Sequence, residues 1–294
     1  MSKTHLSPRD FGQAIGVSES SLKRWVDEGA IHAPRTAGGH RRIPLHEALR
    51  FVRRTGLRVV RPHALGLTPL SVGVQLANPS AQRSDFFHEA FVQGEADLAG
   101  AALLSSYLDG DSVADICDNL IAPAMHRIGQ LWLQDRNGIG LEHRATATCL
   151  EALNHFRAVL PPPASDAPLA LGCAPEHDPY IIPSLAAATV LAASGWQQIN
   201  LGPFTPMDVL VHSAQTLRPR LVWIAFTSLV DAGVLRELHD FVPLLEDHDG
   251  SLIIGGQGLL GAATGGRPAL NMGASMGDLE RFAQGAQERV AHVK

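Results

Sequence analysis

The chain has 294 residues, of which 45% are hydrophobic, and a formal net charge of −5. This length suffices for two or three domains that each bury their own core. No apolar run reaches the roughly eighteen residues of a membrane helix and the N-terminus lacks a signal-peptide core, so we expect neither membrane insertion nor export. Three scattered cysteines without Cys-x-x-Cys spacing favour a reducing cytoplasm and argue against a disulfide framework or a zinc site.

Charge is distributed unevenly along the chain. Residues 1–62, which we call the head, contain twelve of the 24 Lys and Arg residues but only five of the 29 Asp and Glu residues. The head therefore has a balance of +7 and the rest of the chain −12. A basic segment joined to an acidic body is typical of nucleic-acid binding, and the alternative for such a charge run is a solvated surface without a partner.

Two serines in the head are placed to cap short helices. Ser7 begins a helix predicted over 7–14, Ser18 begins one over 18–28, and a tight turn joins them. This arrangement predicts a helix-turn-helix, whose second helix enters the major groove of DNA. The side chains expected to face inward on the second helix are Leu22, Trp25 and Val26.

A basic segment with a glycine tip follows the second helix. Gly38 and Gly39 permit the positive φ angles of a hairpin tip, and the basic residues after them would follow the phosphate backbone as a wing. With Arg24-Trp25 and the Gly-Gly-His-Arg-Arg sequence at 38–42, residues 4 to 58 resemble the winged helix-turn-helix of the MerR family. The predicted contacts with double-stranded promoter DNA are Lys23, Arg24, Arg35, His40, Arg41 and Arg42.

A helical tract follows a proline-containing linker. Residues 63–80 lack apolar periodicity and predict the linker, whereas 81–162 repeat apolar residues at helical spacing and predict a four-helix bundle. The predicted helical segments are 86–94, 98–108, 112–132 and 141–160. The predicted breaks are Gly110, the Asn137-Gly138 pair and residues 161–163.

Five short apolar runs alternate with helix-length segments in residues 166–294. This pattern predicts a Rossmann-like α/β domain with a parallel five-strand sheet, so the fold class is multidomain: winged helix-turn-helix, four-helix bundle and α/β domain. The predicted strands are 169–174, 197–202, 221–226, 251–255 and 269–272. Ligands of such sheets bind beyond the carboxyl ends of the strands.

One strand end contains a dinucleotide-binding pattern. Gly256-Gln-Gly-Leu-Leu-Gly261, with Asp278 downstream, would by itself indicate a nicotinamide-dependent oxidoreductase. The pattern follows the fourth strand instead of the first, and the Gly-Gly-Arg-Pro sequence at 265–268 interrupts any helix after it. We therefore do not expect a dehydrogenase.

The order of the domains resembles the cobalamin-dependent, light-responsive repressors of carotenoid genes over almost the whole chain. In that family the bundle caps the upper face of a corrin held on the α/β domain, and a Trp and a Glu-His pair line the cap. The resemblance implies this role for Trp132, Glu142 and His143. The alternatives are core packing for Trp132 and an ordinary histidine at 143. We expect the Glu-His pair at the beginning of the last bundle helix, reachable only at its terminus.

The strand ends carry further motifs of the same family. Thr227-Ser-Leu229 stands at its Ser-x-Leu position, and Gly255-Gly256 at its glycine turn after the fourth strand. The resemblance implies cofactor contacts at Thr227, Leu229, Gly255 and Gly256. Glycines there would let a ring approach the backbone, although tight turns explain them equally well.

Both cobalt-directed histidines of the family are replaced. Its Asp-x-His-x-x-Gly motif aligns with residues 178–183, which places Tyr180 at the ligand position, and Leu133 stands where light-sensing members carry a histidine. A phenol is a poor donor unless its proton is removed, and His177 reaches the position only if the loop is rebuilt. We therefore assign no metal ligand.

Three interpretations of the sensory region stay open. It is a cobalamin pocket, a pocket for another tetrapyrrole such as a bilin or heme, or a ligand-free scaffold for oligomerisation. In the second case Tyr180, His143, His177 or Glu142 supply polar contacts, and Cys149 or Cys173 is a candidate thioether site.

The sequence favours a non-enzymatic transcriptional regulator. We predict a homo-oligomeric repressor, a dimer or tetramer, that senses a tetrapyrrole and light. A corrinoid-dependent enzyme such as a methyltransferase or mutase is the alternative class. No catalytic constellation lies at the strand ends, and Asp178 and Glu176 are expected to be turn residues.

Overall fold

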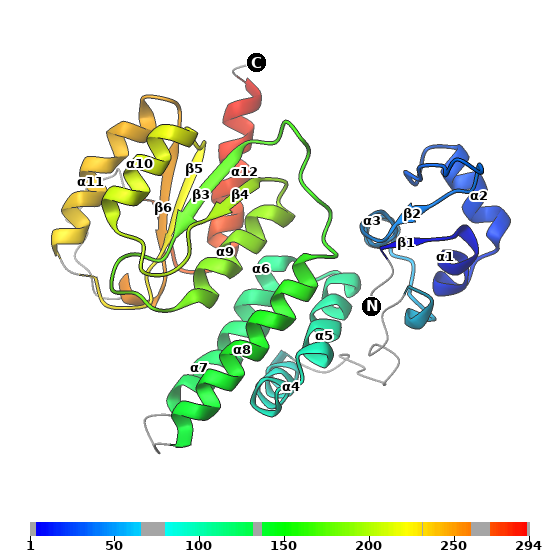
Figure 1. The fold of residues 1–294 in the computed structure, drawn as a ribbon, viewed down its shortest axis with the longest axis horizontal. Helices are drawn as coiled ribbons and strands as arrows, with labels where there is room; N and C mark the ends of the chain where they lie inside the picture. Colours follow the sequence, from blue (N-terminus) through cyan, green and yellow to red (C-terminus); the bar gives the residue numbers. More distant parts are fainter. Residues whose placement is uncertain (1–3, 66–79, 132–136, 231, 260–270, 293–294) are drawn as a thin grey trace. The chain divides into compact units, whose positions relative to one another are not determined.

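The computed structural model describes residues 4–65, 80–131, 137–230, 232–259 and 271–292 (Figure 1). The chain forms two compact units. Unit 1 comprises Met1–Ser112 and Asn119–Pro161, and unit 2 comprises Val113–Asp118 and Pro162–Lys294. Within the described ranges, no helix combines the length and hydrophobicity needed to cross a bilayer.

The head begins unit 1 with two short helices, α1 (Pro8–Ile15) and α2 (Glu19–Asp27). The hydroxyls of Ser7 and Ser18 accept the backbone N–H groups of Asp10 and Ser21, both at 3.1 Å, so the two predicted helix caps are confirmed. Gly16, at φ 72°, ends α1 in the left-handed region and turns the chain toward α2. Leu22 is fully buried and Trp25 packs on Phe51, in agreement with the predicted inward face.

The rest of the head surrounds this helix pair. Strand β1 (His5–Leu6) pairs antiparallel with β2 (Ile43–Pro44), and α3 (Leu45–Thr55) and the short helix η1 (Pro62–Leu65) complete it. The predicted hairpin forms between α2 and β2, with Arg35 opposite Arg41. Gly39, at φ 77°, lies at its tip and donates to the Thr36 carbonyl at 2.8 Å.

Four long helices follow in unit 1: α4 (Ser80–Gln93), α5 (Ala96–Asp109), α7 (Ala122–Leu131) and α8 (Asn137–Arg157). Helix α8 packs against the other three. The buried apolar side chains between them include Phe87, Phe91, Leu103, Ile128 and Leu153.

The predicted helix 112–132 forms as one continuous helical run over 113–131. Within it, the π-helical turn η3 (Cys117–Ile121) separates α6 (Val113–Ile116) from α7. Helix α6 belongs to unit 2, where it packs against α9 (Ile181–Ala193) and α12 (Met276–His292). One predicted boundary in this tract is wrong. The Asn137-Gly138 pair does not end a helix but begins α8, since asparagine is favourable at a helix N-terminus as well as in a turn.

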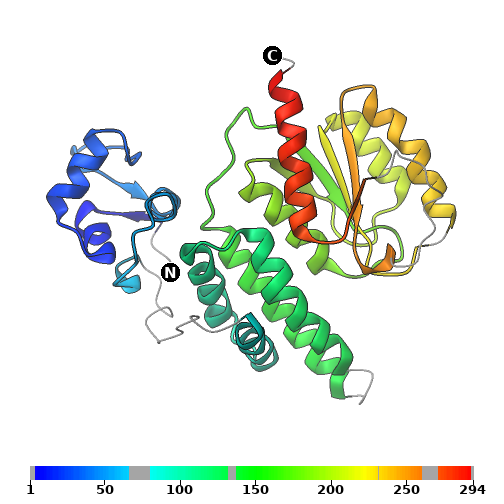
Figure 2. The ribbon, with the colours of Figure 1, turned by 180° about the vertical axis from the view of Figure 1, so that it is seen from behind.

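Unit 2 is built on the predicted parallel sheet. Its strands are β3 (Leu169–Cys173), β4 (Gln197–Asn200), β5 (Leu221–Ala225), β6 (Ser251–Gly255) and β7 (Asn271–Gly273). They are all parallel, in the order β4-β3-β5-β6-β7. Helices α10 (Met207–Leu217) and α11 (Ala232–Glu246) cover one face, and α9 and α12 cover the other (Figures 1 and 2).

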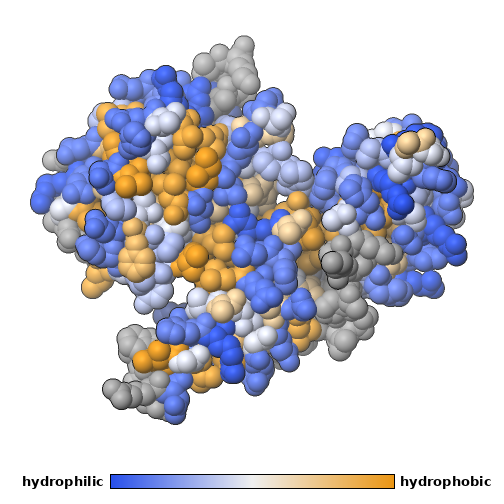
Figure 3. Space-filling view, viewed as in Figure 1, coloured by the Kyte–Doolittle hydropathy of each residue, from blue (hydrophilic) through white to orange (hydrophobic). Residues whose placement is uncertain are grey.

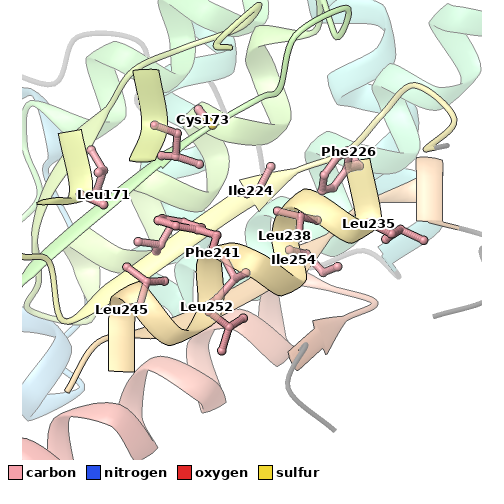
Figure 4. Close-up of a cluster of buried hydrophobic side chains, with 14 of the residues drawn as sticks. Leu171, Cys173, Ile224, Phe226, Leu235, Leu238, Phe241, Leu245, Leu252 and Ile254 are labelled. Atoms are coloured by element: carbon pink, nitrogen blue, oxygen red, sulfur yellow. The ribbon is translucent and has the colours of Figure 1, made fainter. Parts of the chain in front are cut away.

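One hydrophobic cluster of the described core lies between the sheet and helices α10 and α11. Side chains from β3, β5 and β6 meet those of α11, among them Ile224, Ile254, Leu238 and Phe241 (Figure 4). On β3, Gly172 leaves room for the indole of Trp223 on the neighbouring strand. A Cβ at position 172 would lie 2.0 Å from Cδ2 of that indole, closer than any real contact.

We predict that Gly172→Ala destabilises the protein by at least about 1–3 kcal/mol, because the added methyl group overpacks a rigid strand pair. Urea unfolding followed by tryptophan fluorescence measures this change. Gly285→Ala is the control within unit 2, because a Cβ at position 285 would meet only the Arg289 guanidinium, at 3.8 Å. This substitution should not lower stability, since alanine is more favourable than glycine inside a helix. Equal unfolding midpoints for the two variants would contradict the close approach of Trp223.

Candidate functional site

The loops at the carboxyl ends of the strands are held together by backbone hydrogen bonds. After β3 and β4, Ala174 N–H donates to the Gly202 carbonyl at 2.9 Å and Thr205 N–H donates to the Ala174 carbonyl at 3.1 Å. After β5 and β6, Gly258 N–H donates to the Phe226 carbonyl at 2.9 Å. The edge of the sheet at which α/β domains bind ligands is therefore a connected surface.

Asp178 joins these loops through its side chain. The carboxylate is fully buried and accepts the backbone N–H groups of Thr227 at 2.6 Å, Ser228 at 2.9 Å and Tyr180 at 3.1 Å. Its own carbonyl accepts Phe204 N–H at 3.1 Å. Asp178 makes the local contact with Tyr180 that is expected of a turn residue, but two further partners lie about fifty residues away on the β5 loop.

Large apolar side chains are exposed on the same loops. The exposed fractions are 46% for Tyr180, 58% for Phe204 and 87% for Leu229. Phe204 adopts φ 53° and His177 φ 70°, in the left-handed region that costs energy for residues other than glycine. Exposed apolar surface on a strained, anchored loop is typical of a ligand-binding face. Phe204 belongs to the sequence Leu201-Gly-Pro-Phe-Thr-Pro206, which resembles the turn after the second strand in the cobalamin-dependent repressors, but it was not among the predicted cofactor contacts.

The two glycines after β6 are explained by internal packing. A Cβ on Gly256 would lie 2.1 Å from the Phe226 carbonyl oxygen, and one on Gly255 would lie 2.8 Å from the Gly273 carbonyl oxygen. Gly256 also adopts φ 117°. The backbone of neighbouring loops thus requires glycine at both positions, and a ligand is not needed to account for them.

Both cysteines considered for covalent attachment are in the interior. Cys149 and Cys173 are each 1% exposed. Burial raises the pKa of each thiol to about 12, and the reactive thiolate is therefore scarce at neutral pH. The thioether role proposed for them does not fit these positions.

In unit 1, the Glu-His pair of α8 lies one turn further along the helix than expected. Because α8 begins at Asn137, Glu142 and His143 fall in its second turn instead of at its terminus. The Glu142 carboxylate accepts the Thr146 hydroxyl at 2.8 Å and lies 3.7 Å from His143 Nε2, whose side chain is 75% exposed. Trp132 and Leu133 lie outside the described residues.

The predicted DNA-contacting cations of the head divide into two groups. Arg41 Nη2 donates to both oxygens of the Asp27 carboxylate, at 2.7 and 2.8 Å, and Arg35 lies 3.5 Å from the same carboxylate. The hydrogen bond from Arg41 holds the pKa of Asp27 below its usual value. This contact, which we call the Asp27–Arg41 ion pair, ties the hairpin to the end of α2.

The remaining cations of the set point to solvent. Lys23 lies 2.7 Å from Glu19 and Arg24 lies 3.9 Å from Glu28, both pairs along one exposed helix face. His40 and Arg42 are exposed and have no ion-pair partner within the described part of the chain. Arg42 and His40 are therefore the hairpin side chains available to a phosphate.

Asp278, the acidic residue of the dinucleotide pattern, lies at the beginning of α12, and Leu260 and Gly261 of the pattern lie outside the described residues. The Asp278 carboxylate accepts the N–H groups of Ala274 at 2.8 Å and Ser275 at 3.0 Å, and these bonds lower its pKa and begin α12. The Asp278 carboxylate is thus already bonded to the backbone of its own chain. Among the described residues, no group of three or more His, Cys, Asp or Glu side chains is arranged to hold a metal ion.

Comparisons with known proteins agree with the domains predicted for the central and C-terminal parts of the chain. Residues 85–157 match the model of the B12 binding domain family. No curated protein matches the chain. The match does not extend to the head, so the resemblance to the MerR family stays a prediction.

A solved structure of a corrinoid protein shares the fold, and two further structures match with lower scores. The monomethylamine corrinoid protein of Methanosarcina barkeri is 16% identical, with a TM-score of 0.52, over 70% of this chain and 98% of its own. A cobalamin-binding protein from Desulfitobacterium hafniense DCB-2 is 19% identical over 68% and 96% of the two chains, with a TM-score of 0.34. The methanol:cobalamin methyltransferase complex MtaBC from Methanosarcina barkeri is 15% identical over 79% and 87%, also with a TM-score of 0.34.

We predict that Asp178→Asn destabilises the protein by about 1–3 kcal/mol, because the amide cannot accept all the N–H groups that the carboxylate accepts. Hydrogen exchange at residues 227 and 228 should accelerate. Asp247→Asn changes the same charge at an exposed site and serves as the control. Unchanged exchange in Asp178→Asn would show that the β5 loop does not depend on this side chain.

Proposed function

We propose that the protein binds a corrinoid or another flat tetrapyrrole at the carboxyl edge of its sheet, and that this ligand regulates DNA binding by the head. The observation that carries the proposal is the B12 binding domain match in the helices preceding a parallel α/β unit. The exposed Tyr180, Phe204 and Leu229 supply an apolar surface suited to a macrocycle.

The residues of this edge fit the ring better than they fit a histidine-ligated cobalt. On the resemblance stated above, Tyr180 stands where an imidazole would approach the metal. His177 is exposed on the same loop, but its backbone is held at φ 70° by a chain that Asp178 anchors one residue later. Cobalamin remains the first candidate because of the domain match, and a bilin or heme is the alternative.

The geometry of the head supports DNA binding. The head contains two capped helices joined at Gly16 and a basic hairpin after them, and these features support the proposal of a winged helix-turn-helix. The exposed Lys23 and Arg24 lie on the second helix, and Arg42 lies on the hairpin. A balance of +7 on this segment favours phosphate contact, which is consistent with a regulator and with repression of a promoter.

A corrinoid carrier in a methyl-transfer reaction is the second candidate. The fold shared with the monomethylamine corrinoid protein favours it, and the likeness spans most of both chains. Such a carrier has no evident use for a basic head. Methyl transfer measured with free corrinoid donors and acceptors separates the two functions, since a regulator should show none.

We predict that Asp27→Asn weakens DNA binding severalfold, although it removes a negative charge from the head. Charge alone would strengthen the complex, whereas loss of the Asp27–Arg41 ion pair releases the hairpin from α2. Fluorescence anisotropy with a labelled duplex, selected by the wild-type protein from a random-sequence pool, measures the affinity. Glu19→Gln makes the same charge change on α2 without touching the hairpin and should bind at least as tightly.

Arg42→Ala tests the phosphate contact in the same assay. Because a phosphate contact carries no sequence information, binding should weaken about equally for all duplexes, and the slope of log affinity against log salt should fall by about one. Stronger binding by Asp27→Asn, or no effect of Arg42→Ala, would contradict the assignment of the hairpin as a wing.

We predict that the full chain takes up cobalamin, a bilin or heme, with an absorption spectrum that lacks the signature of histidine-ligated cobalt. Phe204→Ala should reduce uptake by removing an exposed contact, whereas Val209→Ala, at an exposed position on α10, should not. Tyr180→His should strengthen corrinoid uptake if the scaffold is a cobalamin site and leave bilin or heme uptake unimproved. Uptake of none of the three pigments would contradict the proposed ligand.

A further inference from the structure

A groove lies between α10 and α11, on the face of the sheet opposite α9 and α12. Its volume is about 430 Å³, and its apolar lining comes from Met207, Val211, Phe241 and Leu244. Leu244 is 37% exposed, and Val209 on the adjacent turn of α10 is 45% exposed. Figure 3 shows apolar surface, in orange, interrupted by polar surface on this unit. The groove thus offers an apolar floor to a partner.

The rim of the groove is entirely acidic. The polar residues that line it are Glu176, Asp208, Glu237 and Asp240, and no lysine, arginine or histidine lines it. Within the described part of the chain, none of the four carboxylates has an ion-pair partner. Four carboxylates around one apolar floor create a negative potential that only a basic occupant relieves. The occupant should therefore combine an apolar side chain with flanking cations.

The head of the same chain carries a segment with this composition. Between α3 and η1, Arg58 and Arg61 flank Val60, and all three are exposed. Val60 is 58% exposed, and it is the one large hydrophobic side chain of the described head with so much of its surface in water. The segment is fixed in place, because Val60 N–H and Arg61 N–H both donate to the Ala14 carbonyl, at 2.7 and 3.0 Å.

We propose that the groove between α10 and α11 binds the Arg58–Arg61 segment of a second copy of the chain. Val60 enters the apolar floor, and the two arginines face the acidic rim. The segment is already anchored to α1, so little conformational entropy is lost on docking. If each chain of a pair places its Arg58–Arg61 segment in the groove of the other, the contact forms twice and the dimer is closed. Such a dimer has two heads, the number that repeated DNA half-sites require.

The test is the mass and self-association of the full-length protein, measured by sedimentation velocity at low and high salt. We expect a dimer that weakens with salt, and about tenfold weaker association for Arg61→Glu. Val60→Ser should weaken association to a similar degree at all salt concentrations, because the contact it removes is apolar. Far-UV circular dichroism checks that each variant is folded.

A charge exchange makes the pairing specific. As a single substitution, Asp240→Arg should weaken association. The double variant Asp240→Arg with Arg61→Glu should associate again, because the two charges are exchanged. Asp247→Arg is the control, since it makes the same change at an exposed site after α11 that does not line the groove. A wild-type protein that is monomeric at micromolar concentration would overturn the proposal. Docking of the head into the groove of its own chain would overturn it too. Association that neither Arg61→Glu nor Asp240→Arg alters would overturn it as well.

Discussion

The candidate site depends on one buried carboxylate. Asp178 accepts N–H groups from its own loop and from the β5 loop, and its carbonyl holds the β4 loop. Loss of the side chain would leave the N–H groups of Tyr180, Thr227 and Ser228 without this buried acceptor. Three loops from separate strands therefore share a single anchor, and the surface they form exists before any ligand arrives.

That anchor also explains how the protein tolerates unfavourable local structure. Phe204 and His177 hold left-handed backbone conformations, and Leu229 exposes 87% of its surface. Strain of this kind costs of order 1–3 kcal/mol for each residue and persists only where surrounding contacts fix the chain. Neither the strain nor the exposure contributes to a core. Binding is the simplest physical reason for a sequence to retain both.

The sequence predicted the elements well where the signal was local. Buried parallel strands are short apolar runs between breakers, and cap serines act on residues three positions away, so both were recognisable. The π-helical turn at Cys117–Ile121 was not, because the apolar residues of 112–132 keep helical spacing through it. Contacts such as Asp178 with Thr227, or Asp27 with Arg41, join residues that no pattern links.

The path of the chain between its two units limits how the protein can be divided. Residues 113–118 belong to the α/β unit although helices of unit 1 precede and follow them. Asp118, at the end of this insertion, accepts the N–H groups of Met276 and Gly277 at 2.9 and 3.0 Å and so caps α12. A fragment beginning after the bundle would leave that helix end without its acceptor. The α/β unit is therefore complete only when a segment synthesised before its first strand packs against α9 and α12.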